Sequence, residues 1–121
     1  MGTEGFRELR VWQAAKELAI EVYRQSATGP LARDFGLRDQ MRRAAVSIPS
    51  NIAEGDERDT NRDSVRFLYI AKGSLAELRT QLEIAREVGL LTSEIHQPLE
   101  RRCAELGHML GALIKARAEH P

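Results

Sequence analysis

A proline stands inside the stretch of the chain that has the clearest helical pattern. Pro49 has no N–H group, and its ring collides with the carbonyl four residues earlier, which costs a helix about 3 kcal/mol. Around it, apolar residues recur every three or four positions, as on the buried face of one helix. The pattern therefore predicts a helix over residues 37–57 that is kinked at Pro49. The apolar face consists of Met41, Ala44, Ala45, Ile48 and Ile52.

Small and polar residues surround Pro49 and suit such a kink. The two alanines before it let another helix approach closely, and nearby hydroxyl and amide groups can hydrogen-bond the carbonyls that the proline leaves without a partner. A buried acid needs a paired Arg or several donors, so structural pairing is expected for Arg43, Asn51 and Glu54, with ligand binding as the alternative. The predicted structural motif consists of Arg43, Ser47, Pro49, Asn51, Glu54 and Gly55.

Three more helices are predicted around this one. Apolar residues spaced three and four apart indicate helices over residues 8–26, 61–88 and 93–117, and a connection from Thr28 to about Gly36 follows the first of them. Four amphipathic helices with short links predict an all-α, up-and-down antiparallel four-helix bundle, in one domain over residues 1–121. The expected core residues outside the central helix are Val11, Ala15, Leu18, Val22, Leu68, Ala71, Leu75, Leu78, Leu82, Ala85, Leu99, Cys103, Leu106, Leu110 and Leu113.

The starts of the last two helices carry their own signals. Thr60 and Asp63 read as a capping box, and Thr92 or Ser93 can cap the last helix. Pro98 allows two interpretations. Either it kinks an early turn of the last helix, or the regular helix begins there with proline at its first position.

Composition narrows the classes of partner. Lys plus Arg equals Asp plus Glu at 18 each, so the chain has no global field for nucleic acid or membranes, and binding must come from local patterning. Of these cations, 15 are Arg, the residue suited to bidentate contacts with phosphate or carboxylate. The single Cys103 fits a reducing compartment, and no apolar run approaches the roughly 18 residues of a membrane span. We therefore expect a cytoplasmic protein with no membrane partner.

The third predicted helix has two unusual stripes. Lys72, Arg79 and Arg86 repeat every seven residues along one edge of its apolar seam, and Arg62 and Arg66 extend this cationic surface past Tyr69. Three interpretations stay open: a nucleic-acid surface, a solvated face in which Glu83 pairs with both neighbouring arginines, and a contact with Glu of another subunit. The second stripe, which predicts burial against another subunit, consists of Phe67, Ile70, Ile84 and Val88.

Catalytic patterns are weak in this chain. Glu105 and His108 have the spacing of a di-iron helix unit, but such a site needs two of these units, and a surface pair is the simpler interpretation. His96 and Cys103 share a helix face about 10 Å apart, too far for direct proton transfer, so Cys103 is expected to be a core residue. We predict no catalytic residue, no metal and no cofactor.

Three segments resemble a known family. They are Phe6 to Trp12, Leu37 to Gly55 with the specific run Ser-Ile-Pro-Ser-Asn-Ile-Ala-Glu-Gly, and Arg66 to Leu82. They look like the bacterial four-helix bundle proteins encoded by intervening sequences of large-subunit ribosomal RNA genes, once labelled S23 ribosomal proteins. The resemblance implies a ring-shaped homopentamer. It also implies kinship with the accessory variability determinant of diversity-generating retroelements, a strongly basic protein that binds nucleic acid and a reverse transcriptase.

These observations lead to three hypotheses. The first is a non-enzymatic homopentameric module that binds RNA, DNA or a nucleic-acid enzyme such as a reverse transcriptase through Arg-rich surfaces. The second is a purely structural or protein-interaction ring whose charges serve its own interfaces. The third is a metal-dependent bundle enzyme.

Overall fold

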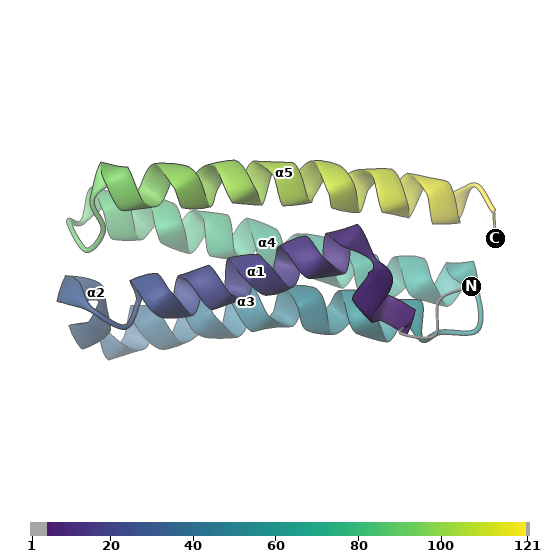
Figure 1. Cartoon of the computed structure of the whole chain (residues 1–121), viewed down its shortest axis with the longest axis horizontal. Coiled ribbons are helices and arrows are strands. Elements are labelled where there is room, and N and C mark those ends of the chain that lie inside the picture. The colour runs from purple at the N-terminus through teal and green to yellow at the C-terminus, as the bar shows by residue number, and fades with distance from the viewer. Residues whose placement is uncertain (1–4, 121) are drawn as a thin grey trace.

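Four long helices lie along a common axis in the computed structural model, which describes residues 5–120 (Figure 1). Within these residues no strand occurs, so the prediction of an all-α chain is confirmed. The expected domain ran from residue 1 to residue 121, and its first four residues and Pro121 lie outside the described part. The elements are a 3-10 turn η1 (Gly5–Glu8), α1 (Arg10–Gln25), α2 (Gly29–Arg33), α3 (Phe35–Asp56), α4 (Asn61–Glu87) and α5 (Ser93–Ala118).

Each long helix packs on two others. α1 contacts α3 and α5, and α4 contacts the same two helices. The connections from α1 to α3 and from α4 to α5 lie at one end of the molecule, and the connection from α3 to α4 lies at the opposite end (Figure 1). This arrangement encloses one core between the four helices.

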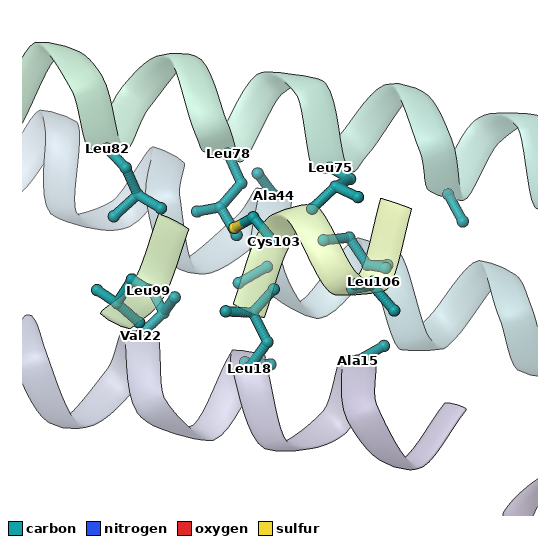
Figure 2. Close-up of a cluster of buried hydrophobic side chains, with 14 of the residues drawn as sticks. Ala15, Leu18, Val22, Ala44, Leu75, Leu78, Leu82, Leu99, Cys103 and Leu106 are labelled. Atoms are coloured by element: carbon teal, nitrogen blue, oxygen red, sulfur yellow. The ribbon is translucent and has the colours of Figure 1, made fainter. Parts of the chain in front are cut away.

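The core is made by the side chains that the helical spacing selects. All five apolar residues predicted for the central helix are buried, as are those of the heptad stripe in α4. Side chains from the four long helices meet around Leu18, Leu78 and Cys103 (Figure 2). The stripe of α5 ends on buried Ile114, and Leu113 packs only partly against the core.

The connection between α4 and α5 is closed by backbone hydrogen bonds. Gly89 has a φ of +83°, the left-handed conformation that favours glycine. This lets the Leu90 N–H donate to the Ala85 carbonyl at 2.8 Å and the Gly89 N–H to the Arg86 carbonyl at 3.1 Å, the bonds of a Schellman motif. The glycine therefore ends α4 as its position in the sequence predicts.

Threonine hydroxyls cap the N-termini of α4 and α5. Thr60 Oγ1 accepts from the Asp63 N–H at 3.2 Å at the start of α4. Thr92 Oγ1 accepts from the Ile95 N–H at 3.3 Å, so α5 begins at Ser93. Pro98 consequently lies inside α5, and the interpretation in which the helix begins at Pro98 is wrong.

A short helix occupies part of the connection predicted between residues 28 and 36. α2 carries Pro30 in its first turn, where the missing N–H would have no partner in any case. Leu31 is buried and anchors this turn to the core. The Thr-Gly-Pro segment follows the end of α1. It also begins α2, because the first turn of a helix tolerates proline.

α3 continues through Pro49 without interruption. Asn51 Nδ2 donates to the Ser47 carbonyl at 2.8 Å and to Ser47 Oγ at 3.0 Å. The polar groups around the proline therefore bond to one another, and the bend at Pro49 stays a prediction.

Among the helices of residues 5–120, none combines the length and the apolar character required to cross a membrane.

Candidate nucleic-acid interface

The two exposed flanks of α4 face different neighbours. Ser74 Oγ lies 2.8 Å from Ser47 Oγ of α3, which defines one flank. Arg79 hydrogen-bonds Glu100 of α5, which defines the other. Residues 72, 79 and 86 lie on the α5 side, because heptad neighbours share a helix face, and residues 70 and 88 lie on the α3 side with Ser74. Lys72, Arg79 and Arg86 thus lie on the opposite flank of α4 from Ile70 and Val88.

The central cation of the stripe is held by the neighbouring helix. Two N–H groups of Arg79 donate to Glu100 Oε1, the Nε bond measuring 3.0 Å. The Glu100 carboxylate raises the pKa of the Arg79 guanidinium. The interpretation in which Glu83 pairs with both neighbouring arginines is therefore wrong for Arg79, whose partner is Glu100 of α5.

Arg86 is held within its own helix. Its Nη2 lies 2.5 Å from Glu83 Oε2, one turn earlier. This hydrogen bond lowers the pKa of the Glu83 carboxyl and raises that of the Arg86 guanidinium. Glu83 also lies 3.6 Å from Nε2 of buried His96, so it joins α4 to the start of α5.

The remaining three cations of the stripe are more open. Arg66 Nη1 lies 4.0 Å from Asp63, and Lys72 Nζ lies 5.9 Å from the centre of the Tyr69 ring. Both are exposed, as is Arg62, which makes no ion pair or side-chain hydrogen bond with the residues that the structure describes. These three side chains can still meet an external anion.

The apolar stripe is shorter than the sequence predicts. Ile70, Ile84 and Val88 are exposed on α4, and Ile84 also lines a hollow with Glu83 and Glu100. Phe67 differs from them because it is half-buried, and the Arg58 guanidinium lies 4.3 Å from the centre of its ring. We call Ile70, Ile84 and Val88 the apolar flank.

The motif around Pro49 holds α3 against α4. The hydroxyls of Ser47 and Ser74 join the two helices at their middle, and Gly55 is buried where they come closest. A Cβ on Gly55 would lie 3.0 Å from the Ser64 carbonyl oxygen and 3.2 Å from the Cβ of Phe67. The backbone of α4 therefore leaves little space for a Cβ at this position, which favours glycine.

Arg43 and Glu54 lie too far apart to pair with each other, and Glu54 has a structural partner elsewhere. Glu54 is exposed and forms an ion pair with Arg58 at 3.0 Å, one turn later. Arg43 lies on the surface beside a hollow that Ser47 and Glu77 also line. The distance along the helix explains this result, because eleven residues of α-helix span about 16 Å.

The two enzyme-like pairs of α5 differ in their exposure to solvent. Glu105 and His108 are both exposed on α5, and the described residues contain no group of three or more potential metal ligands. Cys103 is completely buried, and this burial raises the pKa of its thiol to about 12. A thiol with this pKa is not a nucleophile near neutral pH.

Two features escaped the sequence interpretation. Arg117 of α5 donates to Asp56 of α3 at 2.8 Å and to the hydroxyl of Ser64 in α4. Local spacing does not predict these bonds, because the residues are far apart in the chain. Tyr23 of α1 is exposed, and the guanidinium of Arg42 from α3 lies over its ring.

Comparison with known proteins identifies a matching family and a similar solved structure. Residues 7–112 match the family described as 23S rRNA-intervening sequence protein. The fold is similar to the 1.70 Å crystal structure of a Bacteroides thetaiotaomicron protein with unknown function from the S23 ribosomal protein family. The TM-score is 0.79, with 23% identity over 87% of this chain and 98% of that one. A search of curated proteins found no match. Because the matched segment contains the motif around Pro49 and the whole of α4, the protein belongs to the 23S rRNA-intervening sequence protein family.

Proposed function

We propose that this protein is a non-enzymatic, up-and-down four-helix bundle that self-associates and binds RNA or DNA through the cationic side of α4. The observation that carries the proposal is the exposed surface of α4, which has apolar Ile70 and Val88 on one flank and Lys72, Arg79 and Arg86 on the other. The exposed apolar residues supply a contact between subunits, and Arg62, Arg66 and Lys72 are open to phosphate.

Self-association supplies what a neutral chain lacks. A homopentamer, as the resemblance implies, would repeat the modest cationic stripe around a ring and so create a continuous basic surface. The same surface can dock a nucleic-acid enzyme such as a reverse transcriptase. The lone cysteine supports a reducing compartment such as the cytoplasm as the place where this occurs.

Light scattering tests the assembly. Ile84→Asp places a charge in the apolar flank and should reduce the mass of the particle to that of the single chain. Ala76→Asp is the matched control, because this exposed residue lies outside the apolar flank and should leave the mass unchanged. A wild-type protein with the mass of one chain would contradict self-association.

Salt-dependent binding to a structured RNA hairpin tests the ligand. Affinity should fall steeply as salt is raised, since each phosphate contact releases counterions. A Lys72→Gln, Arg62→Gln double variant should lower both the affinity and the salt slope, and Arg101→Gln on exposed α5 is the control. A wild-type protein that does not bind at low salt would end the nucleic-acid proposal.

A specific observation favours the second candidate, a ring that binds no nucleic acid. Arg79 and Arg86 are already paired with Glu100 and Glu83. If the charges serve interfaces within the ring, Arg79→Glu should change the mass of the assembly and leave RNA binding absent.

A further inference from the structure

Two exposed aromatic rings lie where α1 and α3 come together, away from the cationic stripe of α4. Tyr23 is 46% exposed and Phe35 is 64% exposed. Each ring is covered on one side by a guanidinium group. Arg42 Cζ lies 4.6 Å from the centre of the Tyr23 ring, and Arg38 Cζ lies 4.8 Å from that of Phe35. We call these four residues the stacking face.

The fold holds both guanidinium groups in place. Arg42 Nε donates to Ser26 Oγ at 2.8 Å, and Ser26 is completely buried at the end of α1. Arg38 Nη1 donates to the Ala32 carbonyl of α2 at 3.1 Å. The two arginines are four residues apart on α3, and side chains with this spacing are neighbours. The stacking face is therefore a surface built from α1 and α3, with Arg38 held by a carbonyl of α2.

Charge is concentrated around this surface although the whole chain is neutral. Residues 21–48 contain five Arg and three acids, Glu21, Asp34 and Asp39. All three acids are engaged. Glu21 lies 3.5 Å from Arg24 Nη1, Asp34 Oδ1 accepts from the Leu37 N–H at the start of α3, and Asp39 lies 2.9 Å from Arg38 Nε. This segment has an excess of two positive charges, which the rest of the chain balances with two negative ones. The stacking face thus lies in a locally positive field.

The chemistry of the face selects its ligand. An aromatic ring that is stacked with a guanidinium on one side offers its other side to a further flat group, and the N–H groups of arginine recognise phosphate. Nucleobases of a single strand meet both requirements, whereas the bases of a duplex are already stacked and paired. An acidic peptide would use the charge but would leave the exposed ring faces without a partner.

We infer that the stacking face of Tyr23, Phe35, Arg38 and Arg42 binds a single-stranded nucleic acid by base stacking. This site is separate from the cationic stripe of α4, and it rests on the proposed function only in taking nucleic acid as the ligand. The protein would then hold single-stranded segments at one end of α1 and α3 and phosphate-lined duplex segments along α4.

Fluorescence anisotropy with labelled oligouridylate and oligodeoxythymidylate of about 12 nucleotides tests the inference. Tyr23→Leu and Phe35→Leu remove an exposed ring and keep an apolar side chain, and each should weaken binding roughly tenfold or more. Tyr23→Phe, which retains a ring, should restore most of the affinity. Tyr69→Leu is the matched control, because Tyr69 is a 55% exposed tyrosine on α4 whose loss should not affect single-strand binding. Equal loss with both oligonucleotides indicates the shared chemistry, and a loss confined to oligouridylate indicates RNA.

Three outcomes would overturn the inference. The first is unchanged single-strand affinity in Tyr23→Leu and Phe35→Leu variants that keep the helical circular dichroism of the wild type. The second is a loss in Tyr69→Leu alone, which would move stacking to α4. The third is equally tight, ring-independent binding of poly-glutamate at this face, which would indicate an acidic protein partner. A protein that binds the single strands but not the hairpin would refute the α4 proposal and leave this inference standing.

Discussion

Gly55 shows how one missing side chain sets the distance between two helices. It is buried near the end of α3, and a Cβ there would meet the backbone oxygen of Ser64 at 3.0 Å. A backbone atom cannot move aside as the end of a flexible side chain can. Glycine at this position therefore lets the helix that carries Pro49 approach α4 without crowding the Ser64 carbonyl.

Gly55→Ala should destabilise the protein by about 1–3 kcal/mol, because overpacking outweighs the gain in helix propensity. Gly73→Ala is the matched control. Gly73 lies in the middle of α4 with nothing within 4 Å of its would-be Cβ, so alanine there should stabilise the fold by up to about 1 kcal/mol. Urea unfolding measures both changes. Equal stability of the two variants would contradict the close approach.

The burial of Cys103 makes the stability of the fold depend on pH. Burial raises the pKa of its thiol from 9.0 to about 12, so the folded protein holds this proton more tightly than the unfolded chain does. The resulting stability is fully present below pH 9 and is lost as the pH rises toward 12.

The difference in free energy of unfolding between the wild type and Cys103→Ala should therefore shrink as the pH is raised from 8 to 10.5. The slope above pH 9 is at most about 1.4 kcal/mol per pH unit. Other alkaline groups titrate in both proteins and cancel in the comparison. A difference that stays constant across this range would show that the thiol is accessible to solvent.

At the scale of elements, side-chain hydrogen bonds join the helices at one end of the bundle as well as at their middle. Arg117 near the end of α5 bonds to Asp56 at the end of α3 and to Ser64 in the first turn of α4. Both members of the ion pair are half-buried, so solvent screens them less than a surface pair. One side chain thus connects three of the four long helices at one end of the bundle.

Arg117→Ala should cost roughly 1–2 kcal/mol in thermal or urea unfolding, because the half-buried carboxylate of Asp56 loses its charged donor. The control is Arg24→Ala, which removes an exposed arginine that pairs with Glu21 one turn away and should cost at most a few tenths of a kcal/mol. Similar costs for the two variants would show that the Arg117 network contributes no more than a surface ion pair.

At the scale of the whole molecule, the distribution of apolar surface decides whether the chain functions alone. The four helices bury one shared core, yet Ile70, Ile84 and Val88 stay outside it on one side of α4. Scattered exposed apolar residues are ordinary, whereas a row of them along one helix is typical of an interface.

If this row is an interface, association stabilises the folded state by mass action. The Tm of the wild type should then rise with protein concentration, and the Tm of Ile84→Asp should not. Differential scanning fluorimetry over a hundredfold range of concentration measures both. A wild-type Tm that is independent of concentration would contradict an assembled protein.

Periodicity alone determined the all-α class and most of the core, because three-four spacing in this chain reflects the geometry of one helix. The sequence also predicted the N-cap at Thr60 and the end of α4 at Gly89, because the hydrogen bonds at both positions join residues that are close in sequence. The sequence did not reveal that Arg79 pairs with Glu100 and not with Glu83. It also did not reveal that Tyr23 stacks on Arg42. Such pairs join residues that are distant in the chain, so only the packing of whole helices decides which charge or ring each arginine meets.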